Sequence, residues 1–233
     1  MNPLDAETTV ADARAAAPRP DRSEGASSPS GEPAAVDSLA GLLAARAAAS
    51  PDRPAIAVAD GDAVTTWTWL ELAAVAVRGA EHLEAAGLCR GDRLAHVGSH
   101  SAEWFVIDLA CLLAGIVHLP LHAGAAAADH REQLGWLEPR GLVTSGLLPG
   151  GRLSGWAKEG SGRVAVPPPP GGWLQGDRPD QQLVQAALTA RCVATDPDAC
   201  CTIVLSSGTT GQPQASHSIG MIARNERPRS VAS

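Results

Sequence analysis

The chain has 233 residues, 45% of them hydrophobic, and a formal net charge of -7. These values are typical of a globular protein with one substantial core. The negative charge argues against nonspecific nucleic-acid binding, which needs a basic surface.

The N-terminal part of the chain gives no sign of regular structure before residue 37. Residues 1–36 are rich in Ala, Pro, Ser, Asp and Arg, and no apolar run follows a basic start. We therefore expect a disordered leader there rather than a signal peptide. A helix is expected to begin at Asp37 or Ser38, with Leu39, Leu42 and Leu43 directed inward.

A hairpin and a second helix are expected next. Ala55–Ala59 and Ala63–Trp67 read as strands on either side of residues 60–62. Thr68 and Glu71 have the spacing of a capping box, in which each residue satisfies the other's backbone N–H. The apolar residues that follow fall on one helical stripe ending near Gly87. They are Leu72, Val75, Ala76, Gly79 and Leu83.

Strand and helix signals then alternate. A strand is expected over Leu94–Val97, a helix from its cap at Ser101 to Gly115, and another strand over Ile116–Leu119. This alternation predicts an α/β fold with a largely parallel sheet flanked by helices, and an α/β subdomain over 37–144.

The long apolar stretch Trp104–Ala128 could suggest a membrane span. Asp108, two histidines and Pro120 interrupt it, so a buried helix and strand explain it better. We predict no transmembrane segment.

Two histidine pairs have the spacing of metal ligands. His96 with His100, and His118 with His122, have the four-residue spacing of two ligands on one helix face. Pro120 interrupts the second pair and the first spans a strand end, so we predict no metal site.

The five cysteines form no Cys-x-x-Cys pair, which indicates a reducing compartment and a cytoplasmic protein.

The final third of the chain contains a linker, a helix and a strand. Residues 145–180 are rich in Gly and Pro, so we expect a loop or linker there. Gln181–Ala190 reads as a short helix and Cys201–Leu205 as a buried strand. We group residues 181–214 as a unit of helix, strand and phosphate-binding loop, and expect residues 215–233 to form an atypical, disordered tail.

The loop after this strand has the composition of a phosphate-binding site. Its two glycines tolerate positive φ, so successive backbone N–H groups can point into one hollow, and its hydroxyl side chains add donors. It is neither a Walker A sequence nor a Gly-x-Gly-x-x-Gly fingerprint. An ordinary surface turn is the alternative. The residues that we expect to bind a cofactor phosphate are Ser206, Ser207, Gly208, Thr209, Thr210 and Gly211.

This loop resembles the phosphate-binding signature of the AMP-forming adenylating enzymes, a superfamily that includes acyl-CoA synthetases, luciferases and peptide-synthetase adenylation domains. Residues 206–213 match that signature in order. Two positions then depart from it, because Gln214 stands where the family has Lys and Ala215 where it has Gly. The chain's only lysine is Lys158, so it cannot hold both of the family's phosphate-loop and distal catalytic lysines.

Upstream segments extend the resemblance over about residues 38–213, with an unmatched middle. Residues 66–72 are similar to the family's early aromatic-Thr-x-x-Glu-Leu segment, and 91–94 to its Gly-Asp-Arg-Val turn. Residues 103–121 are similar to the helix and strand that follow, most closely in long-chain fatty acid–CoA ligases.

The resemblance implies carboxylate adenylation by ATP with Mg²⁺, followed by thioester formation with coenzyme A. The loop would hold the β- and γ-phosphates, and the carboxylic acid would be a fatty acid. It implies no catalytic residue in this chain, no nucleic-acid partner, and peripheral membrane contact at most.

Three hypotheses follow from the sequence. The first is an N-terminal fragment of an acyl-CoA ligase homologue, inactive as an isolated chain because the later family motifs are missing. The second is a non-catalytic binding or regulatory protein that retains half of the ligase fold, with a separately encoded C-terminal fragment as a possible complement. The third is an unrelated α/β domain whose loop is only a turn.

Overall fold

The computed structural model describes residues 38–60, 63–145, 155–158, 160–176, 179–194, 199–207 and 213–219. The expected leader and the end of the expected tail, 220–233, lie outside them. Five helices and eight strands occur in the described residues. The helices are α1 (Leu39–Ala49), α2 (Trp69–Ala85), α3 (Ala102–Ala114), α4 (Ala127–Leu137) and α5 (Gln181–Ala194). The strands are β1 (Pro54–Asp60), β2 (Ala63–Thr68), β3 (Arg93–Gly98), β4 (Val117–His122), β5 (Gly141–Thr144), β6 (Val164–Ala165), β7 (Cys200–Ser207) and β8 (Pro213–Ile219).

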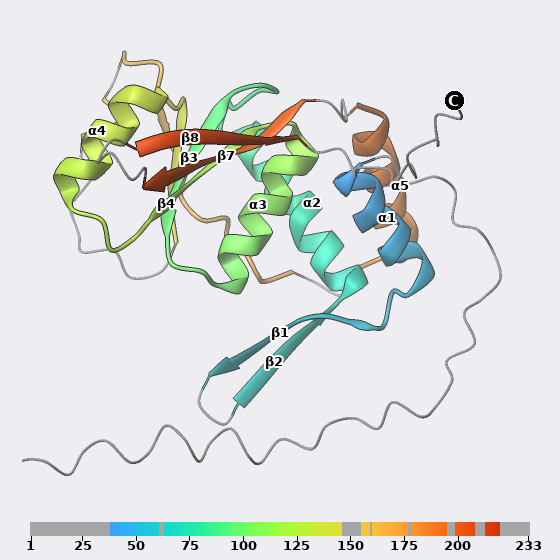
Figure 1. Ribbon diagram of the computed structural model, residues 1–233. Helices are drawn as coiled ribbons and strands as arrows, with labels where there is room; N and C mark the ends of the chain where they lie inside the picture. The colour runs from blue at the N-terminus through green and yellow to red at the C-terminus, as the bar shows by residue number, and fades with distance from the viewer. Residues whose placement is uncertain are drawn as a thin grey trace, which may run out of the picture. The chain divides into compact units, whose positions relative to one another are not determined.

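The central sheet has the strand order β6-β5-β3-β4-β7-β8 (Figure 1). The first five strands are parallel, and β8 runs antiparallel to β7. This arrangement confirms the predicted α/β fold with a largely parallel sheet flanked by helices. The β1–β2 hairpin forms a separate two-stranded antiparallel sheet, as the sequence predicts.

Alternate residues of the parallel strands face two different hydrophobic clusters. Leu94 and Val143 belong to the larger cluster, which contains the buried residues of α1, α2, α3 and α5. Ala95 and Leu142, their neighbours in the strands, belong to the smaller cluster with Leu134 of α4. This is the period-two alternation of strands that are covered on both faces.

Local capping fixes the ends of three helices, as the sequence predicts. Ser38 and Ser101 accept hydrogen bonds from the backbone N–H groups of Gly41 and Trp104, and Gly115 ends α3 at a φ of 68°. Thr68 and Glu71 form the predicted reciprocal capping box at the start of α2.

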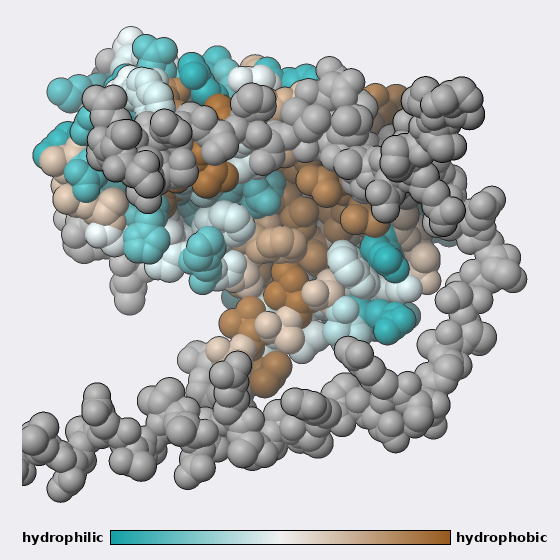
Figure 2. Space-filling view, viewed as in Figure 1, coloured by the Kyte–Doolittle hydropathy of each residue, from teal (hydrophilic) through white to brown (hydrophobic). Residues whose placement is uncertain are grey.

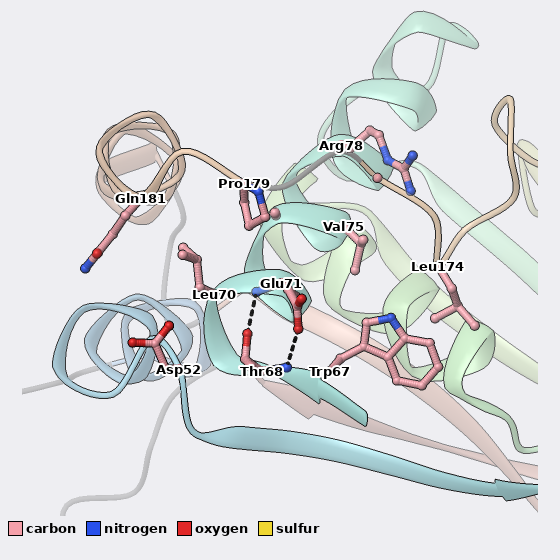
Figure 3. A pocket seen from close by; sticks show the side chains of 12 residues that line it. Asp52, Trp67, Thr68, Leu70, Glu71, Val75, Arg78, Leu174, Pro179 and Gln181 are labelled. Carbon is pink, nitrogen blue, oxygen red and sulfur yellow. Dashed lines mark hydrogen bonds between the residues drawn. The ribbon is translucent and has the colours of Figure 1, made fainter. Parts of the chain in front are cut away.

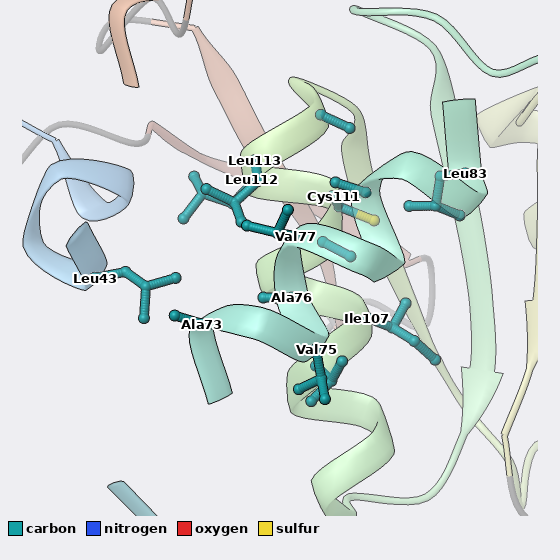
Figure 4. Packing of buried hydrophobic residues seen from close by; sticks show 14 of the residues in the cluster. Leu43, Ala73, Val75, Ala76, Val77, Leu83, Ile107, Cys111, Leu112 and Leu113 are labelled. Carbon is teal, nitrogen blue, oxygen red and sulfur yellow. The ribbon is translucent and has the colours of Figure 1, made fainter. Parts of the chain in front are cut away.

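Close packing of α2 on α3 forms the centre of the larger cluster. The predicted stripe of α2 is buried, with Leu72 and Leu83 almost fully inaccessible. Figure 4 shows side chains of α2, among them Val77 and Leu83, with Ile107 and Cys111 of α3. A fully buried leucine contributes roughly 1.5–3 kcal/mol relative to an exposed one. Because many residues between the helices are small, most of the stabilisation from burial comes from a few branched side chains.

The Gly/Pro-rich tract adds one large side chain to this core. Trp173 is only 1% exposed and lies against His82 of α2, with the ring centroids 5.7 Å apart. Arg78 of α2 donates hydrogen bonds to the carbonyls of Gly172 and Trp173. The part of the tract around Trp173 is therefore packed onto the helical layer, and the tract contributes β6 to the sheet.

Several details differ from the expectations. Leu39 and Leu42 are exposed by 42% and 39%, because the buried face of α1 consists of Ala40, Leu43 and two further alanines. Helix α4 and strand β5 were not expected. Part of the expected tail, up to Ile219, forms β8, which pairs with β7.

Apolar side chains also reach the surface. Figure 2 shows apolar surface that continues onto the β1–β2 hairpin, where Val64 is 66% exposed. In the part of the chain that the structure describes, no helix is both long and apolar enough to cross a bilayer.

Candidate functional site

The predicted phosphate loop joins the two strands of an antiparallel pair. Ser206 and Ser207 end β7 and are in register with Gln214 and Pro213 of β8. Their main chains therefore take part in the hairpin. The other predicted residues of this site, Gly208, Thr209, Thr210 and Gly211, lie outside the described residues.

The hairpin loop follows the carboxyl end of a parallel strand. Strands β3, β4, β5 and β7 all run in the same direction, so their carboxyl ends meet at one edge of the sheet. Ligands of open α/β sheets bind outside this edge. The position of the loop thus agrees with a binding role.

Strand β4 is the neighbour of β7 on the inner side of the hairpin. The two strands share a single register pair, His118 with Thr202. His122 and Ser206 each lie four residues beyond that pair. The turn after β4 is held by His122, whose Nδ1 accepts from Gly124 N–H at 3.0 Å and whose carbonyl lies 2.9 Å from Nε2 of His130.

The thiols of Cys200 and Cys192 are not activated nucleophiles. Burial raises the pKa of the Cys200 thiol, and the adjacent Cys201 raises it further. Burial likewise raises the pKa of Cys192 in α5. A catalytic cysteine needs the opposite shift, towards the thiolate.

A pocket of about 840 Å³ lies elsewhere, at the start of α2 (Figure 3). Its lining includes Trp67, Glu71, Arg78 and Leu174, and no residue from the carboxyl ends of β3, β4, β5 or β7. The Glu71 carboxylate is engaged in the capping box, and the Arg78 guanidinium binds two carbonyls. We therefore do not assign the phosphate site to this pocket, despite its size.

A polar cluster that the sequence does not predict is buried between the sheet and α3. His96 of β3 and His118 of β4, from the two histidine pairs that we rejected as metal ligands, contact each other. Asp108 and Ser145 lie at the two ends of this pair. The available signal was a polar residue in each of two apolar, neighbouring strands. Among the described residues, no group of three or more His, Cys, Asp or Glu could hold a metal ion.

Comparison with known proteins identifies a family. The model of the AMP-binding enzyme family matches residues 43–217. Acyl-coenzyme A synthetase ACSM5 of Mus musculus is 28% identical over 189 residues, which are 76% of this chain and 32% of that protein. Acyl-coenzyme A synthetase ACSM4 of Homo sapiens is 32% identical over 164 residues, 68% of this chain and 27% of that protein. Both relatives are described as mitochondrial.

Solved structures have the same fold. The o-succinylbenzoate coenzyme A synthetase MenE of Bacillus subtilis, in complex with AMP, superimposes with a TM-score of 0.55 at 22% identity. The match covers 76% of this chain and 41% of that one. The chain spans about a third of the length of the two synthetases above.

Proposed function

Because this chain belongs to the AMP-binding enzyme family, we propose that its β7–β8 loop binds the polyphosphate of ATP for the activation of a carboxylic acid. The main support for this proposal is the motif from Ser206 to Pro213, which matches the family signature in order and begins at the carboxyl end of a parallel strand. Glycines and hydroxyl side chains at this position supply the donors that a phosphate needs.

The chemistry of the family gives the loop its role. When bound, ATP with Mg²⁺ supplies an α-phosphate for attack by a carboxylate, and coenzyme A later displaces AMP from the acyl-adenylate. We assign to the loop the binding of the β- and γ-phosphates, where its donors stabilise the leaving pyrophosphate. We infer a fatty acid as the substrate of the whole enzyme.

Gln214 is expected to weaken this binding. An amide in place of the family's ammonium group removes one charge-assisted contact, worth roughly 1.5–3 kcal/mol. This difference corresponds to a loss of about ten- to 150-fold in affinity. The single lysine of the chain, Lys158, cannot replace both family lysines. We therefore propose that the chain binds ATP weakly and does not turn over by itself.

The test compares three variants of the full chain by calorimetric titration with MgATP. Gln214→Lys should tighten binding by about tenfold or more, since it restores the charged contact. Gly208→Val should abolish binding, because it adds a branched side chain where we propose that the backbone approaches the phosphate. Thr210→Ser keeps the hydroxyl and serves as the matched control. Equal affinities across all the variants would refute the assignment of this loop.

A second measurement separates binding from catalysis. We expect no ATP–pyrophosphate exchange by the isolated chain with any fatty acid. Exchange would show that the chain is catalytic and would overturn the proposed inactivity.

The substitution at Gln214 also favours a second candidate, a non-catalytic binding or regulatory protein. This candidate predicts that exchange stays absent when a C-terminal fragment of a related ligase is added to the Gln214→Lys variant. The fragment hypothesis predicts that the same mixture becomes active.

A further inference from the structure

A buried chain of hydrogen bonds crosses the sheet beneath α3. Nδ1 of His118 lies 2.6 Å from Oδ1 of Asp108, and Nε2 of His118 lies 3.1 Å from Nδ1 of His96. Nε2 of His96 lies 2.7 Å from Oγ of Ser145. We call these four residues the buried relay. Both imidazoles are 0% exposed and Ser145 is 4% exposed, whereas the Asp108 side chain is 32% exposed.

When both rings are neutral, the Asp108 carboxylate fixes the direction in which the hydrogen bonds of the relay run. A carboxylate only accepts, so Nδ1 of His118 donates to Asp108. A neutral His118 then accepts at Nε2, which requires a proton on Nδ1 of His96. His96 in turn accepts at Nε2, and the Ser145 hydroxyl donates to it. Every polar atom along the relay has a partner in this state.

One added proton gives a second arrangement, in which every ring nitrogen again has a partner. If the Nδ1 proton of His96 passes to Nε2 of His118, His118 becomes an imidazolium paired with Asp108. One proton from water takes its place on Nε2 of His96, which then donates to Ser145. The ring of His96 stays neutral in both arrangements. Only its tautomer changes.

We propose that the buried relay is a one-proton switch, in which proton uptake reverses its hydrogen bonds and turns Ser145 from a donor into an acceptor. The geometry permits this because each ring contacts a partner through both of its nitrogens. The Ser145 hydroxyl hydrogen then no longer points to His96. Ser145 directly follows β5, so the change is delivered at the carboxyl edge of the sheet.

The relay is limited to one proton. Burial, together with the neighbouring His118, lowers the pKa of His96 to about 3. A positive charge on the His96 ring, in addition to the one on His118, is therefore excluded near neutral pH. Asp108 is the only acidic group that the described residues place in hydrogen-bond contact with the pair. The Trp104 ring packs on both imidazoles. His100 is exposed and packs on Trp104. The Cys111 thiol faces Asp108 and stays neutral, because burial raises its pKa.

This inference does not depend on ATP binding and is tested without nucleotide. Imidazole ¹⁵N shifts of the full chain, recorded between pH 8 and pH 5, distinguish the tautomers and the imidazolium. We expect His118 to become doubly protonated, and His96 to move its proton from Nδ1 to Nε2 at the same midpoint. A His96 that keeps one tautomer throughout, or becomes charged in this range, would overturn the proposal.

Variants test the ends of the relay. Asp108→Asn keeps the shape and an acceptor oxygen but removes the charge, so the proton affinity of His118 should fall about tenfold or more. Ser145→Ala should also lower that affinity, because the second state then leaves a buried N–H unpaired. His100→Gln is the control and should leave the midpoint unchanged. An unshifted midpoint in Asp108→Asn would also refute the switch, and the wild-type spectra decide the matter if a variant fails to fold.

Discussion

The contact between α2 and α3 depends on the absence of a side chain at Gly79. A Cβ placed there would lie 2.9 Å from Cβ of Ala110 and 3.5 Å from the ring of Trp173. Carbon atoms pack at about 3.5–4.0 Å, so the contact with Trp173 is an ordinary one, but Gly79→Ala must push α2 and α3 apart at Ala110. Overpacking of this kind costs about 1–3 kcal/mol.

Gly135 in α4 provides the matched control. It is an exposed helical glycine, and a Cβ there would meet nothing within 4 Å. Replacing a helical glycine by alanine gains about 1 kcal/mol from helix propensity in either position. We therefore expect Gly135→Ala to stabilise the chain by about 1 kcal/mol. Gly79→Ala should leave the stability unchanged or lower it by up to about 2 kcal/mol.

Urea denaturation of the two variants, followed by circular dichroism, measures this difference. The double variant Gly79→Ala with Ala110→Gly removes the close contact, and we expect a favourable coupling of about 1 kcal/mol or more between the two positions. If Gly79→Ala stabilised the protein as much as Gly135→Ala does, the helices would not be in the close contact described here.

Three further predictions concern a cap, an ion pair and a buried histidine. Thr68→Ala should cost about 1 kcal/mol in urea denaturation because α2 loses its capping box, whereas Thr68→Ser should cost little. Arg191 and Glu84 form a two-point ion pair with distances of 2.8 and 3.0 Å. Glu84→Gln should cost less than about 1 kcal/mol, and 1 M salt should reduce the difference, because the Glu84 side chain is 45% exposed. Burial lowers the pKa of His96 in the folded protein from the ordinary value of 6.5 to about 3, so its contribution to stability is complete above pH 6.5 and is lost as the pH falls towards 3. Wild type should lose about 2 kcal/mol more than His96→Asn between pH 7.5 and pH 5, and equal losses would contradict the burial of a neutral ring.

Local signals explain what the sequence could predict about the fold. The caps at Ser38, Thr68 and Ser101 need only residues within one helical turn, and all three occur as expected. The stripe of α2 was predicted correctly because its apolar spacing matches a single helix face. The sense of the sheet followed from the alternation of strands and helices.

The missed elements carry weak local signals in the sequence. Helix α4 is largely polar, and Ala126 offers no side-chain cap, so only Asp129 marks its start. Strand β8 has little strand character by itself and is defined by pairing with β7. Leu42 was assigned to the core by its hydrophobicity, but the helix turns its alanine-rich face inward.

Of the candidate functional residues, the sequence predicts one group and does not predict the other. The loop from Ser206 to Gly211 is predicted from sequence because its donors are consecutive, and it stays a prediction because Gly208 to Gly211 lie outside the described residues. The buried relay is not predicted, because His96 and His118 become neighbours only when β3 pairs with β4. The two histidines lie 22 residues apart, so spacing along the chain does not reveal their contact.

The junction of β4 with β7 has a mechanical consequence for the sheet. In the described residues, six register pairs join β3 to β4 and one joins β4 to β7. Fewer register pairs therefore hold the β7–β8 hairpin to the parallel strands than hold β3 to β4. The β4 residue of that single pair is His118, so the backbone that carries one ring of the buried relay is also the backbone that aligns the hairpin with the sheet.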